Sequence, residues 1–141
     1  MMAVQKHNGS QPVAPSKIPR MTSDEDICEV VITAADADWL AAFTRRLVGD
    51  RLAACGQQIP AIRSIYRWEG AVHDDAEARV ALHTRTSLVP QIVERTNAEH
   101  PYEVPCVLAL PVITGNPAYL DWVRTQTTPP PGPRGSAEPA A

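Results

Sequence analysis

Proline is distributed unevenly along this chain, and its positions limit which part of the sequence can fold. Eight of the fourteen prolines lie in residues 1–25 and 128–141, among glycine, serine and other polar residues. Such segments bury too little apolar surface to offset the entropy of ordering them, so we expect both ends to be disordered. Residues 26–127 then form one domain, which buries only about 60–70% of its unfolded surface. Association with further copies would stabilise a domain of this size.

Charge and hydropathy exclude two classes of partner. Residues 26–127 hold nine arginines, no lysine and thirteen acidic residues, a net charge of −4 with histidine neutral. No basic run with interleaved aromatic residues occurs, and phosphate binding depends on one, so we expect no nucleic-acid partner. No apolar stretch approaches the roughly 20 residues that span a bilayer, so we expect no membrane partner.

Cysteine usage indicates a reducing compartment. Cys28, Cys55 and Cys106 are odd in number and widely spaced, without a CxxC motif. The N-terminus also lacks the apolar core of a signal peptide. We therefore expect three reduced thiols and a cytoplasmic location.

Extended and helical patterns alternate through the first half of the domain. The β-branched run at residues 27–33 predicts a strand whose alternate residues share one face. Asp36 or Asp38 can cap a helix with apolar residues at helical spacing. An extended stretch follows at residues 55–68, where Pro60 indicates a bulge or an edge strand.

A hairpin turn at Glu69 and Gly70 joins this stretch to a strand predicted over residues 77–84, with Ala78, Val80 and Leu82 facing inward. His73 then falls in the solvated return turn, beside Asp74 and Asp75.

The second half repeats the helix and strand patterns. Ser87 can cap a helix with Pro90 in its first turn, and this helix should end before Pro101. Residues 104–111 predict a fourth strand, and Asn116 caps a last helix with Pro117 as its first residue.

The resulting order is βαββαβ with a C-terminal helix. This predicts an α+β fold of the ferredoxin-like, split βαβ type, in which an antiparallel four-stranded sheet carries two helices on one face. We expect the second face to have no cover within the chain. The central hairpin is also long for so small a domain, and both features favour association with a partner.

Three stretches carry a resemblance to a known family. They are LAACGQQIPAIRSIYRWEG at residues 52–70, HPYEVP at 100–105, and LPV at 110–112 followed by GNP at 115–117 and YLDW at 119–122. In order and spacing they resemble the CutA divalent-cation tolerance family. The resemblance implies a homotrimer in which long hairpins pair, a role in metal tolerance, chiefly to copper, and a structural kinship with P-II type signalling proteins.

The resemblance also implies a copper site, which this sequence matches only in part. The family has been linked to copper through a first-strand cysteine, the histidine before Pro-Tyr and a glutamate after the second proline. Here Ile32, His100 and Cys106 stand at those positions, and His83 replaces a usual lysine.

Two readings of the metal candidates remain open. His100, Glu103 and Cys106 lie within seven residues and could bind copper or another divalent metal weakly. Alternatively, Cys106 packs in the core on the strand face of Leu108 and Leu110, and His100 only ends a helix.

The aromatic residues allow two interpretations as well. Tyr66, Trp68, Tyr102, Tyr119 and Trp122 could line an intersubunit ligand cleft, or could pack in a trimer interface. The polar residues predicted to line such a cleft are Arg67, Glu69, His83, His100 and Tyr102.

The sequence gives little support for catalysis, and we expect that the chain is not an enzyme. Cys55 or Cys106 would act as a nucleophile only beside a histidine or helix terminus, which spacing alone does not place. The leading hypothesis is a homotrimer that responds to metal ions by weak binding or by contacts with a protein partner. The alternative is a P-II-like module that binds an anion or nucleotide through Arg63, Arg67 and Arg85.

Overall fold

Four strands and three α-helices form from residues 26–128, the part of the chain that the computed structural model describes. In chain order the elements are β1 Ile27–Ala34, α1 Ala37–Gly49, β2 Cys55–Trp68, β3 Ala71–Arg85, the 3-10 turn η2 Thr86–Leu88, α2 Val89–Glu99, β4 Val107–Pro111 and α3 Pro117–Gln126. The predicted βαββαβ order with a C-terminal helix is confirmed. The two ends predicted to be disordered lie outside the described residues, apart from Thr128.

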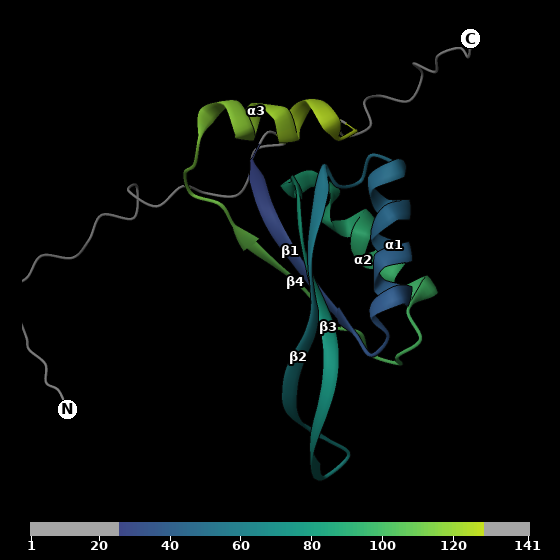
Figure 1. The fold of residues 1–141 in the computed structure, drawn as a ribbon. Helices are drawn as coiled ribbons and strands as arrows, with labels where there is room; N and C mark the ends of the chain where they lie inside the picture. Colours follow the sequence, from purple (N-terminus) through teal and green to yellow (C-terminus); the bar gives the residue numbers. More distant parts are fainter. Residues whose placement is uncertain (1–25, 129–141) are drawn as a thin grey trace, which may run out of the picture.

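The strands form one antiparallel sheet in the order β2-β3-β1-β4. Helices α1 and α2 lie on one face of this sheet, and the β2–β3 hairpin extends well beyond the rest of the domain (Figure 1). The split βαβ arrangement expected from the element order is therefore present. The sheet ends in two edge strands, β2 and β4.

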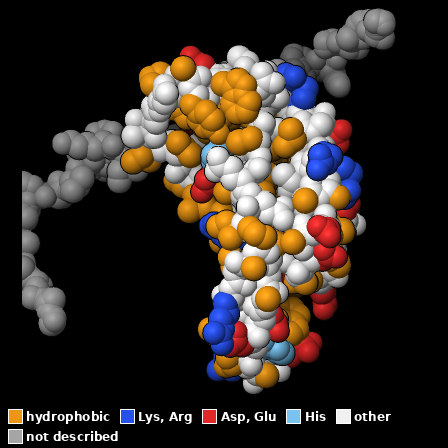
Figure 2. Space-filling model, in the orientation of Figure 1, with side chains coloured by type: hydrophobic (Ala, Val, Ile, Leu, Met, Phe, Trp, Pro, Cys, Tyr) orange, Lys and Arg blue, Asp and Glu red, His pale blue; other side chains and the backbone are white. Residues whose placement is uncertain are grey.

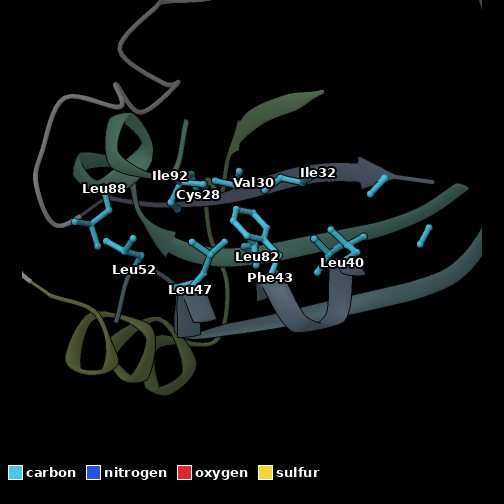
Figure 3. Packing of buried hydrophobic residues seen from close by; sticks show 14 residues of the cluster. Cys28, Val30, Ile32, Leu40, Phe43, Leu47, Leu52, Leu82, Leu88 and Ile92 are labelled. Atoms are coloured by element: carbon cyan, nitrogen blue, oxygen red, sulfur yellow. The ribbon is translucent and has the colours of Figure 1, made fainter. Parts of the chain in front are cut away.

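Helix α1 packs three large side chains into the core. The Asp36 carboxylate accepts hydrogen bonds from the backbone N–H groups of Asp38 and Trp39 at 2.8 and 3.2 Å, so Asp36 is the cap. Leu40, Phe43 and Leu47 follow at helical spacing and are fully buried. Figure 3 shows them packed against alternate residues of the sheet, including Cys28, Val30, Ile32 and Leu82.

The hairpin confirms the predicted bulge. The pairing of β2 with β3 shifts between Ile59 and Ile62, so Pro60 lies in the irregular stretch of an edge strand, where its missing N–H breaks no ladder. Glu69 and Gly70 close the hairpin with φ angles of 51° and 82°. Two consecutive positive φ angles match the right-handed twist of the flanking strands.

The return strand is longer than its hydrophobic pattern predicted. β3 begins at Ala71, directly after the turn, so the prediction of a solvated turn around His73 is wrong. His73 lies opposite Tyr66, and the two rings stack with centroids 5.2 Å apart. The tight two-residue turn lets pairing continue to the tip, and cross-strand contacts of this kind stabilise polar residues in a strand.

The second half of the domain departs from prediction at two boundaries. α2 begins after η2 with Leu88 as its cap, so Ser87 is not the capping residue, and its hydroxyl has no hydrogen-bond partner. β4 begins at Val107 rather than at residue 104. Pro105 has no N–H to donate to β1, which accounts for the later start. The predicted cap of α3 is confirmed, because the Asn116 side chain accepts from the N–H of Ala118.

Helix α3 covers one end of the second face of the sheet. Val123 is fully buried there and packs with Ile27 and Ala54. The prediction that this face has no cover within the chain is therefore wrong at this end. Elsewhere the face stays open, and Leu108 and Leu110 of β4 are 60% and 45% exposed.

Gly56 is required by close packing between β2 and α1. A Cβ atom at this position would lie 2.4 Å from Cγ2 of Thr44 and 3.0 Å from Cδ2 of Leu82. We expect Gly56→Ala to lower the free energy of unfolding by about 1–3 kcal/mol through overpacking, measured by urea denaturation. Gly49→Ala is the matched control, because nothing lies within 4 Å of its Cβ position. The control should be neutral or stabilise by up to about 1 kcal/mol, and equal losses in both variants would contradict the packing argument.

Candidate functional site

A cavity of about 520 Å³ opens on the second face of the sheet, where the hairpin leaves the body of the domain. Its walls come from β1, from the hairpin and from the segment between α2 and β4. The lining residues are Thr33, Ser64, Tyr66, Trp68, Glu77, Tyr102, Glu103, Val104 and Cys106.

The strand period determines which hairpin residues reach this cavity. Ser64, Tyr66 and Trp68 alternate along β2, so their side chains share one face, and all three line the cavity. Arg67 points to the opposite face and lies outside the lining. Glu69 occupies the hairpin turn, and it is not a lining residue either.

Two phenol–carboxylate pairs lie at the cavity, and its lining includes Tyr66, Tyr102 and Glu77 but not Asp75. The Tyr102 hydroxyl donates to Oε2 of Glu77 at 2.6 Å, and the Tyr66 hydroxyl donates to Oδ2 of Asp75 at 2.6 Å. Burial, together with the hydrogen bond to Glu77, raises the pKa of Tyr102 well above its usual value. The hydrogen bond to Asp75 is the largest cause of the raised pKa of Tyr66. Both phenols therefore act as neutral donors that hold the carboxylates in place.

His100 supports the wall of the cavity from behind. It is the C-cap residue of α2 and is 7% exposed. Its Nδ1 accepts from the backbone N–H of Tyr102 at 3.0 Å, which leaves Nε2 to donate to the carbonyl oxygen of Thr33 at 2.8 Å. Both ring nitrogens are thus used, and His100 fixes the turn that carries Tyr102 into the cavity.

The predicted metal ligands are not brought together as one group. Glu103 and Cys106 both line the cavity, whereas His100 is engaged by backbone groups outside the lining. Within residues 26–128, no three side chains of the histidine, cysteine, aspartate or glutamate type are placed to hold a metal ion. Cys106 is half-buried, and its neighbours Leu108 and Leu110 are exposed rather than part of the core.

The charged side chains that line the cavity are all acidic. Its charged lining residues are Glu77 and Glu103. The arginines considered for anion binding lie elsewhere: Arg63 forms a two-point ion pair with Asp74, and Arg85 is buried and donates to the backbone of Arg124. The arrangement therefore favours a cation over an anion.

His83 belongs to a different cluster, which sequence reasoning missed. It contacts Glu29, Cys55 and Tyr119 near the end of the sheet that α3 covers. Glu29, Cys55 and His83 sit on three different strands, so only the strand register relates them. The one signal in the sequence is that Glu29 and His83 each interrupt an apolar strand on the face opposite the core.

The fold and the site define a small α+β protein with a split βαβ sheet, an overhanging hairpin and an acidic cavity at the base of that hairpin. Residues 28–126 match the CutA1 divalent ion tolerance protein family, and the chain belongs to this family. The resemblance seen in the sequence is thereby confirmed. No helix within the described residues is long and apolar enough to cross a membrane.

Relatives and solved structures agree with this assignment. The divalent-cation tolerance protein CutA of Thermus thermophilus is 43% identical over 98 residues, covering 70% of this chain and 95% of the relative. Protein CutA of Homo sapiens is 38% identical over 123 residues, 85% of this chain and 69% of the human protein. The solved structure of CutA1 from Oryza sativa superimposes with a TM-score of 0.71 at 36% identity, covering 73% of this chain and 94% of the rice chain.

The Tyr102–Glu77 pair should contribute measurably to stability. Glu77 is 8% exposed, so Tyr102→Phe leaves a buried carboxylate oxygen without its donor. We expect the free energy of unfolding to fall by about 1–3 kcal/mol in urea denaturation. Tyr66→Phe is the matched control, because its bond to Asp75 lies on the exposed hairpin and its loss should lower the free energy of unfolding much less. Equal effects of the two variants would contradict a buried role for Glu77.

Proposed function

We propose that this chain acts in divalent-cation tolerance as a homotrimer that binds metal ions weakly in the acidic cavity. The proposal rests on the negative charge of the cavity lining, in which the charged residues are the carboxylates Glu77 and Glu103. Cys106 adds a sulfur donor, which suits copper better than a hard divalent ion.

Weak binding by one chain follows from the ligand set. Glu77 already accepts a hydrogen bond from Tyr102, so Glu103 and Cys106 are the donors with fewer constraints. Two donors fall short of the four that zinc usually takes. We propose that a neighbouring subunit completes the set, which couples metal binding to assembly.

Self-association is supported by the exposed apolar surface of the chain. Val104, Leu108, Leu110 and Ile113 are all exposed and lie on or beside β4, an edge strand of the sheet. Hydrophobic side chains also gather over the α3 end of the molecule, whereas the hairpin tip is charged (Figure 2). Exposed apolar side chains that gather in one patch of a small protein mark interfaces. The number of three subunits is proposed from the family resemblance.

The cytoplasm remains the predicted compartment of this chain. The relative in Arabidopsis thaliana is named chloroplastic.

The assembly is tested by light scattering on the purified chain. We expect three chain masses, unchanged by a chelator, because apolar packing rather than metal holds the subunits. Leu108→Asp combined with Leu110→Asp should shift the population to single chains, whereas Gln91→Asp on the exposed surface of α2 should not. A single folded chain at micromolar concentration would overturn the trimer.

Metal binding is tested separately by calorimetry and thermal shift with copper and zinc salts and with a panel of nucleotides. We expect a copper response that weakens by about tenfold in affinity in Glu103→Gln and in Cys106→Ser, since each removes one donor. Glu94→Gln, an exposed change on α2, is the matched control and should leave the response unchanged. Stabilisation by a nucleotide instead of a metal would favour the P-II-like alternative, in which the chain is a regulatory module that binds an anion.

A further inference from the structure

Four polar side chains from four elements meet on the second face of the sheet, close to α3. They are Glu29 of β1, Cys55 of β2, His83 of β3 and Tyr119 of α3. The strand register aligns three of them, because His83 is the cross-strand partner of Glu29 on one side and of Cys55 on the other. This cluster does not overlap the lining of the acidic cavity.

The hydrogen bonds of His83 have a definite direction. Its Nε2 lies 2.9 Å from Oε2 of Glu29, and a carboxylate only accepts, so Nε2 carries the proton. Nδ1 is then the acceptor, and it lies 2.6 Å from the Tyr119 hydroxyl and 3.5 Å from Sγ of Cys55. The same hydroxyl is 3.2 Å from Sγ. The thiol proton therefore has two routes to Nδ1, one direct and one through the phenol.

We propose that Cys55 is a nucleophilic thiol that undergoes exchange with small disulfides, with His83 as its base and Glu29 as the positioning residue behind the imidazole. A thiol, an imidazole and a carboxylate in this order form the general arrangement that activates a cysteine. The proposal does not depend on the role in metal tolerance.

The exchange balances without a further reactant. The Cys55 thiol gives its proton to Nδ1 of His83, and the resulting imidazolium pairs with the Glu29 carboxylate. The thiolate attacks one sulfur of the disulfide, the old S–S bond breaks, and a new S–S bond forms at Cys55. The leaving thiolate takes the proton from the imidazolium and departs as a thiol. Reversal by a free thiol restores Cys55.

The surroundings of Sγ favour a disulfide over an acyl substrate. Acyl transfer builds charge on an oxygen and needs donors placed for that oxyanion. The groups that contact Sγ, the phenol of Tyr119 and the imidazole of His83, are already used to move the proton. Thiol–disulfide exchange only passes negative charge from one sulfur to another, so it needs no such donors.

Tyr119 keeps its proton and the thiol is accessible. Burial, followed by the hydrogen bond to Cys55, raises the pKa of Tyr119 to about 12, so the hydroxyl is intact at neutral pH. Cys55 is partly exposed at the start of an edge strand, whereas Cys28 is 1% exposed in the core. Cys106 is exposed to a similar degree as Cys55, which makes it the internal reference.

The test measures mixed-disulfide formation at each cysteine of the reduced full chain with 2-hydroxyethyl disulfide near neutral pH, by mass spectrometry of peptides. We expect Cys55 to react at least about tenfold faster than Cys106. His83→Gln should remove this advantage, and Gln91→Asp on the exposed surface of α2 should leave the rate at Cys55 unchanged. In Glu29→Gln the pH profile of the rate should move to higher pH, because the imidazolium loses its counter-charge.

Unfolded protein provides the control for variants that fold poorly. In urea all three cysteines should react alike, and wild-type Cys55 should react faster folded than unfolded, which requires the cluster to be intact. A rate at Cys55 that is no greater than at Cys106, or no greater folded than unfolded, would overturn the proposal. Either result would leave the metal-binding experiments unaffected.

Discussion

The antiparallel register of β3 against its two neighbours is the constraint on which both polar sites depend. β3 is paired on both sides, with β2 along the hairpin and with β1 along the body of the sheet. Because side chains alternate strictly along a strand, this register sends Val80 and Leu82 into the core and Glu77 and His83 to the second face. A slip of one residue would exchange the two sets, burying charge and exposing the core.

The second face therefore exposes both carboxylates and large apolar side chains to solvent, which is unusual for a single domain. Near the hairpin it carries a cavity with two carboxylates, and along β4 it carries exposed leucines. Only its α3 end is covered, by Val123 and its neighbours. A small domain with limited burial would gain stability if further copies covered such a face, and in the proposed function those copies also add donors to the acidic cavity. Assembly and cation binding are thus coupled in the function proposed for this member of the CutA1 family.

Much of the fold could be predicted from local patterns. The sequence predicts a helix cap at Asp36 or Asp38, a bulge or an edge strand at Pro60, and a cap at Asn116. The structure has the first cap at Asp36 and agrees with the other two, because each feature rests on the chemistry of one or two residues. The sequence does not predict the start of β3 at Ala71 or the cap of α2 at Leu88. His73 is polar and flanked by aspartates, so its place in a strand depends on its partner Tyr66 across the hairpin rather than on its own sequence neighbours.

The sequence by itself determined the order of the elements, the family, the residues of the core and the aromatic side of the hairpin, since these follow from periodicity and short motifs. Only the tertiary structure decided that His100 is held by backbone groups and that His83 lies between Glu29 and Cys55. Sequence proximity suggests His100 and Cys106 as partners instead. The sequence alone could not place His83 between Glu29 and Cys55, because side chains on different strands meet through the register of the hydrogen-bonded strands. That register depends on the whole sheet rather than on spacing along the chain.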